Sequence, residues 1–249
     1  MLKSLISKTP VYLYFKFLLF RLKKQNKSID ELNFFSQFIS KSDLCFDVGA
    51  NIGNKSQSFL SLGAKVVAIE PQNYCYKFLK LRFRNKIIIR KVALGAKKHV
   101  ASIHLNDENT ISSLSLDWIK KVKEKRFRNF IWDKTEEVEV TTLDDLITEY
   151  GTPKFCKIDV EGYEYEVLKG LNTRIEFISF EFAWPESLEL AAKCLEHLQK
   201  LGDYKCNYSE GENMKLRYKQ WIPGNEFIAR LPELKTEETD WGDIYIKFN

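Results

Sequence analysis

From residue 43 onward, short runs of strand-forming residues alternate with longer amphipathic stretches, and this alternation restricts the fold more than any other feature. Repeated strand–helix–strand units build a parallel sheet covered by helices. The five runs are Leu44–Val48, Lys65–Ile69, Ile87–Val92, Phe155–Ile158 and Phe177–Phe182. Their largely apolar character is typical of strands buried on both faces. The pattern predicts an α/β protein with a doubly wound, mostly parallel sheet.

Helices are predicted in segments that connect or follow these runs. Their apolar residues recur at helical spacing, and glycine, which often ends a helix, follows two of them. The predicted helices are Asn54–Leu62, Asn73–Phe83 and Glu186–Leu201. Tyr204–Tyr208 and Ile244–Phe248 are expected to close the sheet as a final antiparallel pair.

The chain of 249 residues is long enough for one large domain with a short extension. We predict a helical N-terminal extension over residues 1–40 and one α/β domain over 41–249, with an insertion at about 96–140. The insertion holds two strand-like runs around a charged helical segment: His99–Leu105, Leu116–Lys125 and Glu137–Thr141. Residues 209–240 form a second irregular stretch. Ligands of doubly wound folds bind at the carboxyl ends of strands, so both irregular stretches are candidate walls of a binding site.

Charge and cysteine content exclude several classes of protein. The formal net charge of +5 is a mild excess for 249 residues, and we predict no nucleic-acid partner. Basic residues do gather near the N-terminus and in residues 120–128, as solvated helix faces or as a surface for an anionic partner. The five cysteines form no C-x-x-C pair, so neither a disulfide framework nor a zinc site is expected. This favours the reducing cytoplasm.

The N-terminal segment Val11–Phe20 is aromatic and aliphatic but contains Lys16. Ten residues are too few to span a bilayer, which needs about 20, and no small-residue cleavage site of a signal peptide follows. Two interpretations stay open. The segment is either a helix packed on the domain or an interfacial helix with a basic flank, which would give peripheral contact at the inner face of the membrane.

A glycine-rich loop follows the first strand. The sequence FDVGANIG supplies Asp47, Gly49, Asn51 and Gly53 between the strand and the next helix. Glycines let the backbone turn sharply and approach a ligand closely. The helix N-terminus behind the loop leaves N–H groups free for a polar or anionic group. The G-x-x-x-G spacing differs from the G-x-G-x-x-G of dinucleotide-binding proteins.

An acidic residue ends the second strand. Glu70 lies about 20 residues beyond the glycine loop, where a carboxylate holds the two hydroxyls of a ribose. A carboxylate suits this role because it accepts hydrogen bonds from both hydroxyls at once. Pro71 then stiffens the turn beside the nucleoside.

Carboxylates also gather after the fourth run. The sequence KIDVEGYE presents Asp159, Glu161 and Glu164 around a glycine, at the end of a central strand. We expect Glu164 to serve the first turn of a helix, where a carboxylate complements the helix dipole. Asp159, Glu161 and Glu181 could together offer oxygen ligands to a metal. No histidine joins them at a diagnostic spacing, so we predict no metal.

These blocks resemble the FkbM family of methyltransferases. The likeness extends over residues 43–183 and is carried by FDVGANIG, VVAIEP, VALG, TTLDDLI and KIDVEGYEYEVLKG, in the family's order. The chain departs from the family at Gln72, where proline is frequent, and at Lys91, where asparagine is frequent. The resemblance implies a class I, Rossmann-like methyltransferase that uses S-adenosylmethionine. Its acceptor would be a small molecule or glycan, methylated on a hydroxyl of a sugar, glycoconjugate or natural product.

The resemblance also implies roles for individual residues. The loop residues Asp47, Gly49, Asn51 and Gly53 would surround the methionine part of the cofactor. Glu70, with Pro71 beside it, would hold the ribose, and the backbone near Ala93 would border the adenine.

A hydroxyl acceptor must lose a proton, which favours a general base near the reacting oxygen. Asp159 is the first candidate, followed by Glu161 and by His104 of the insertion. Two other functions stay open: a cofactor-binding domain without catalysis, and a nicotinamide-dependent oxidoreductase, which the glycine spacing disfavours.

Overall fold

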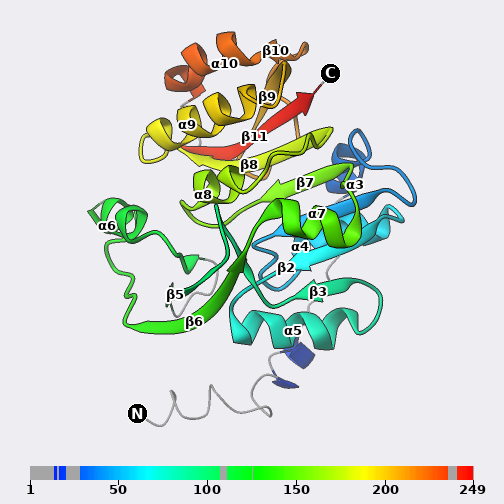
Figure 1. Cartoon of the computed structure of the whole chain (residues 1–249), viewed down its shortest axis with the longest axis vertical. Coiled ribbons are helices and arrows are strands. Elements are labelled where there is room, and N and C mark those ends of the chain that lie inside the picture. Colours follow the sequence, from blue (N-terminus) through cyan, green and yellow to red (C-terminus); the bar gives the residue numbers. More distant parts are fainter. Residues whose placement is uncertain are drawn as a thin grey trace.

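The computed structural model describes residues 14–15, 17–20, 29–106, 111–124, 126–234 and 240–248. Its main sheet has eight strands in the order β10-β9-β11-β8-β7-β1-β2-β3 (Figure 1). The parallel strands are β1 (Leu44–Val48), β2 (Lys65–Ile69), β3 (Ile88–Arg90), β7 (Phe155–Ile158) and β8 (Phe177–Ala183). At the other edge lie β9 (Tyr204–Glu210), β10 (Ile222–Pro223) and β11 (Trp241–Phe248), with β11 antiparallel to both β8 and β9.

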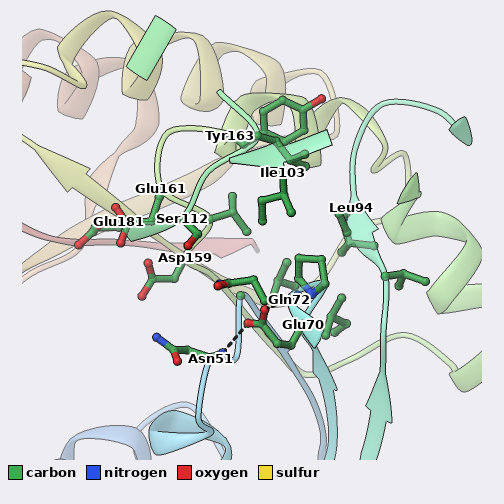
Figure 2. Close-up of a pocket in the computed structure, with 18 of the residues that line it drawn as sticks. Asn51, Glu70, Gln72, Leu94, Ile103, Ser112, Asp159, Glu161, Tyr163 and Glu181 are labelled. Carbon is green, nitrogen blue, oxygen red and sulfur yellow. Dashed lines mark hydrogen bonds between the residues drawn. The ribbon is translucent and has the colours of Figure 1, made fainter. Parts of the chain in front are cut away.

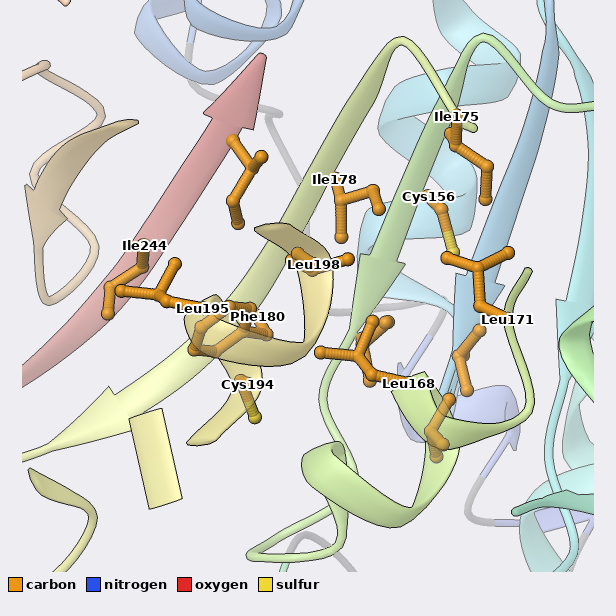
Figure 3. Packing of buried hydrophobic residues seen from close by; sticks show 14 of the residues in the cluster. Cys156, Leu168, Leu171, Ile175, Ile178, Phe180, Cys194, Leu195, Leu198 and Ile244 are labelled. Atoms are coloured by element: carbon orange, nitrogen blue, oxygen red, sulfur yellow. The ribbon is translucent and has the colours of Figure 1, made fainter. Parts of the chain in front are cut away.

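Helices cover both faces of this sheet. On one face, α3 (Ile29–Phe35), α4 (Asn54–Ser61) and α5 (Asn73–Phe83) bury aromatic side chains against the strands. The other face is covered by α7 (Leu143–Tyr150), α8 (Glu164–Lys169), α9 (Leu188–Gln199) and α10 (Gly224–Arg230), followed by the 3₁₀ turn η2 (Leu231–Leu234). Figure 3 shows part of this second core, where Leu168, Leu195 and Leu198 pack over Ile178 and Phe180. The predicted doubly wound α/β fold is confirmed.

A second, smaller sheet has three strands. Its order is β4 (Ala93–Leu94), β6 (Lys134–Thr141) and β5 (His99–Leu105), and α6 (Leu116–Glu124) lies between β5 and β6 in the chain. Of these strands, β4 precedes the predicted insertion and the other two fall largely within it. The third predicted run is therefore wrong as one strand: the chain leaves the main sheet after Arg90 and pairs again only at Ala93, opposite Val140. The other four parallel strands and the final antiparallel pair are confirmed, and Ile244 pairs with Tyr208.

The N-terminal residues that the structure describes include α3 and the helical residues 14–15 and 17–20. Phe17 and Phe20 pack edge-on against Phe78 of α5, with ring centroids 5.6 and 5.1 Å away. No helix in the described residues has the length and apolar character needed to cross a membrane. Lys16 and the basic residues at 21–27 lie outside the described residues.

Candidate functional site

A cavity of about 330 Å³ opens at the carboxyl ends of β1, β2, β7 and β8 (Figure 2). Seven of the predicted site residues line it: Gly49, Asn51, Glu70, Pro71, Ala93, Asp159 and Glu161. As predicted, the two irregular stretches of the chain contribute to its walls, through Ile103, Ser112 and Leu114 from one and Glu212 from the other. The apolar residues Val92, Leu94 and Ile103 offer a surface on which a flat aromatic group can pack.

The glycine loop places two neighbouring strand ends in direct contact. Gly49 has a φ of +78°, and a Cβ atom there would lie 1.8 Å from the carbonyl oxygen of Asp159. Only glycine allows this approach of β1 to β7. Gly53 has a φ of +82°, and a Cβ atom there would lie 2.4 Å from the Phe83 ring of α5. Gly53 therefore serves the packing of α4 on α5 and does not line the cavity, in contrast to the prediction.

Glu70 joins the loop to the end of β2. Its two carboxylate oxygens accept hydrogen bonds from the backbone N–H groups of Asn51 and Gln72, both at 2.8 Å. The side chain is only 2% exposed, and burial raises its pKa to about 7 although these bonds favour the ionised form. Each oxygen keeps a lone pair for one further donor. The carboxylate can thus accept hydrogen bonds from a ligand while it holds the loop (Figure 2).

Asp47 lies behind the loop and not in the cavity. It is 2% exposed, and its carboxylate accepts a 2.5 Å hydrogen bond from the Ser56 hydroxyl of α4. Burial raises its pKa, against the effects of Ser56 and of Lys157. Its side chain fixes the start of α4, and the contact between Asp47 and the cofactor stays a prediction.

Three carboxyl groups meet at the opposite end of the cavity. Asp159, Glu161 and Glu181 each have an oxygen within 4.8 Å of the others (Figure 2). Burial and the neighbouring carboxylates raise the pKa of both Glu161 and Glu181 well above the usual value. A carboxyl group with a raised pKa accepts a proton more readily near neutral pH. The three groups are also oxygen ligands of the kind that Mg²⁺ or Ca²⁺ prefers.

Lys157 is the positive charge next to these acids, and the sequence analysis missed it. Its side chain is 3% exposed and its ammonium lies 2.9 Å from Asp159 and 3.2 Å from Asp243. Burial opposes its charge, but these two carboxylates outweigh that effect and hold its pKa well above the usual value. A lysine inside an otherwise apolar strand was the available signal. Its partner Asp243 could not be inferred, because β11 comes from the far end of the chain.

Two further predicted residues take other positions. Glu164 begins α8 as expected, and its carboxylate accepts the backbone N–H groups of Val160 and Gly162 at 3.2 Å. His104 lies on β5 next to Ile103, which lines the cavity. Because neighbouring side chains of a strand point to opposite faces, His104 faces away. His104 is not among the residues that line the cavity, and its catalytic role stays a prediction.

Comparison with known proteins was made on sequence and on structure. Residues 47–209, more than half of the chain, match the model of the family described as "Methyltransferase FkbM domain". Comparison with curated protein sequences gives no match.

Comparison with solved structures gives matches at low sequence identity. The precorrin-6y C5,15-methyltransferase of Geobacter metallireducens is 11% identical, with a TM-score of 0.46 over 91% of this chain and 93% of its own. The TehB-like SAM-dependent methyltransferase of Corynebacterium glutamicum is 9% identical, with a TM-score of 0.47 over 97% of this chain and 100% of its own. SMU.1697c of Streptococcus mutans, in complex with SAH, is 12% identical, with a TM-score of 0.44 over 87% and 94%.

Proposed function

Because the chain belongs to the FkbM methyltransferase family, whose cofactor is S-adenosylmethionine, we propose that it methylates a hydroxyl oxygen of a sugar, glycoconjugate or natural product. The observation that carries the proposal is the placement of proton-accepting carboxyl groups at one end of the cavity and the Glu70 carboxylate at the other. A hydroxyl acceptor needs a base for its proton, whereas the cofactor needs a partner for its ribose.

The residues of the cavity fit this cofactor. The free lone pairs of Glu70 suit the two ribose hydroxyls, and the apolar side chains of Val92, Leu94 and Ile103 suit the adenine. Gly49 and Asn51 would border the methionine part. When bound, S-adenosylmethionine supplies a methyl group on a positively charged sulfur.

Positioning accounts for much of such a reaction, since alignment alone can supply about 7–11 kcal/mol. In our proposal Lys157 holds Asp159, and Asp159 orients the acceptor hydroxyl. A carboxylate oxygen of Glu161 would accept the hydroxyl proton, and S-adenosylmethionine would supply the methyl group that the acceptor oxygen receives. Glu161 is favoured over Asp159 as the base because its pKa is raised and Lys157 neutralises Asp159.

Transfer of a labelled methyl group tests this function. The protein is incubated with methyl-labelled S-adenosylmethionine and carbohydrate or lipid-linked fractions from cells that lack the gene. We expect labelled product that survives mild alkali, because methyl ethers resist conditions that hydrolyse methyl esters. Label in an alkali-labile product, or in protein only, would contradict methylation of a hydroxyl.

A further inference from the structure

A second cavity, of about 470 Å³, adjoins the first. Glu161, Glu181 and Trp241 line both cavities. A molecule in the second cavity would therefore reach the first one next to the carboxyl groups that face the reaction. The second cavity contains none of the residues that suit the ribose or the adenine.

Aromatic side chains form much of its wall. Trp118 of α6, Phe127 after α6 and Trp241 at the start of β11 all contribute. The Trp118 ring lies directly over Gly162, where a Cβ atom would be only 2.2 Å from it. Rings held in this way offer flat surfaces on which the less polar face of a cyclic molecule can pack.

The charged groups of this cavity are mostly acids. Arg126 is the one basic residue in its described lining, and it is already paired with Asp240 at 2.6 Å. One oxygen of Glu186 is buried and has no hydrogen-bond partner among the described residues. A buried oxygen without a donor is costly, so a ligand that supplies an O–H or N–H there would be stabilised.

We propose that the second cavity binds the methyl acceptor and selects acceptors that carry no negative charge. This inference rests on the proposed function. If Glu161 and Glu181 are ionised, they repel an anionic acceptor at short range. If they hold protons, an anionic acceptor still loses its bound water on entering the cavity. The described residues of the cavity offer no unpaired cation to compensate for that loss. In both cases the carboxyl oxygens can accept hydrogen bonds from the hydroxyl or ammonium groups of an acceptor.

Three matched sugars test the proposal: glucose, glucosamine and glucuronate. Each is titrated into protein saturated with S-adenosylhomocysteine, and the indole ¹H–¹⁵N signals of Trp118 and Trp241 are followed. Trp118→Phe and Trp241→Phe variants assign these signals. We expect both signals to shift with glucose and glucosamine, and the dissociation constant of glucuronate to be at least tenfold higher.

Asp240→Asn provides the decisive variant, because it frees Arg126 to pair with an anion. We expect this change to lower the dissociation constant of glucuronate several-fold and to leave that of glucose unchanged. Glu226→Gln is the control, since it removes an acidic partner from another arginine, Arg230, on the distant α10. It should change neither value.

Two results would overturn the inference: glucuronate binding as tightly as glucose, or no shift of either indole with any of the three sugars. Binding of S-adenosylhomocysteine is measured in the same samples by calorimetry. Its loss would count against the proposed function, whereas its retention with no sugar response would count only against the acceptor cavity.

Discussion

At the scale of single residues, Glu70 has two functions in one carboxylate. It accepts two backbone N–H groups from separate loops and keeps lone pairs directed to the cavity. The sequence predicts Glu70 at the ribose but does not indicate the two backbone hydrogen bonds. Loss of the carboxylate would leave both backbone donors unpaired.

We predict that Glu70→Ala weakens S-adenosylhomocysteine binding at least tenfold, since hydrogen bonds to a charged group contribute about 1.5–3 kcal/mol. It should also lower the free energy of unfolding by about 1–3 kcal/mol for each donor left buried. Calorimetry and urea denaturation measure the two effects. Glu226→Ala, on the surface of α10, should change neither. A variant with normal affinity would remove Glu70 from the cofactor site.

The raised pKa of Glu70 also predicts a dependence of stability on pH. Its pKa is about 7 in the folded protein and 4.5 ordinarily, so between these values only the folded state holds the proton. The free energy of unfolding should therefore fall as pH rises from about 4.5 to 7, by roughly 3 kcal/mol from this group. In urea denaturation of cofactor-free protein, the free energy of unfolding of the parent should fall by this amount relative to that of Glu70→Gln across this window. A constant difference would mean that Glu70 is ionised throughout.

The choice of general base can be settled with two isosteric variants. Glu161→Gln should lower turnover by roughly 10²–10⁴-fold, because the amide cannot accept the proton. Asp159→Asn keeps an oxygen for Lys157 and should lower turnover less than tenfold. Both should bind S-adenosylhomocysteine within a few-fold of the parent. The reverse order of turnover would assign the base to Asp159.

At the scale of helices and strands, the hydrophobic pattern predicted β1, β2, β5 and β7 with their observed bounds. Strands and long helices show a hydrophobic periodicity that can be recognised in the sequence. The helix α10 has only seven residues and lies in a stretch that was predicted to be irregular. The meeting of Asp159, Glu161 and Glu181 follows from adjacent parallel strands, so most of that cluster could be predicted. The second cavity could not, because it requires α6 to pack near the start of β11.

The start of α7, which the sequence analysis overlooked, carries a capping box whose contribution to stability can be measured. The Thr142 hydroxyl accepts the Asp145 N–H at 3.1 Å, and the Asp145 carboxylate accepts the Thr142 N–H at 3.2 Å, which caps α7. We predict that Thr142→Ala lowers the free energy of unfolding by about 1 kcal/mol. Thr148→Ala, exposed in the same helix, should change it by less than about 0.5 kcal/mol. Equal changes in the free energy of unfolding for the two variants, measured by urea denaturation, would show that the cap does not stabilise the helix.

At the scale of the whole molecule, the N-terminal segment has two kinds of apolar residue. Phe17 and Phe20 pack on α5, whereas Phe15 and Leu19 are exposed, at 55% and 42%. We propose that this exposed pair meets the membrane surface peripherally, assisted by the basic residues that follow in the sequence.

Cosedimentation with vesicles tests this proposal. Binding should require anionic lipid, fall in high salt, and weaken in a Phe15→Ser, Leu19→Ser double variant. Val100→Ser, which removes an exposed apolar residue from β5, is the control and should bind like the parent. Protein that stays on membranes after both salt and carbonate extraction would point to a true anchor instead.

The contact of Gly49 with Asp159 has a consequence for how such a molecule can diversify. Backbone contacts backbone there, without a rotatable side chain between the two strands. The distance between the Glu70 end and the acidic end of the first cavity is therefore set by the register of β1 on β7. The second cavity, by contrast, takes part of its wall from α6, the residues that follow it and the start of β11. If the second cavity binds the acceptor as proposed, we expect acceptor preference to change when these peripheral segments are exchanged, while the distance between the two ends of the first cavity stays constant.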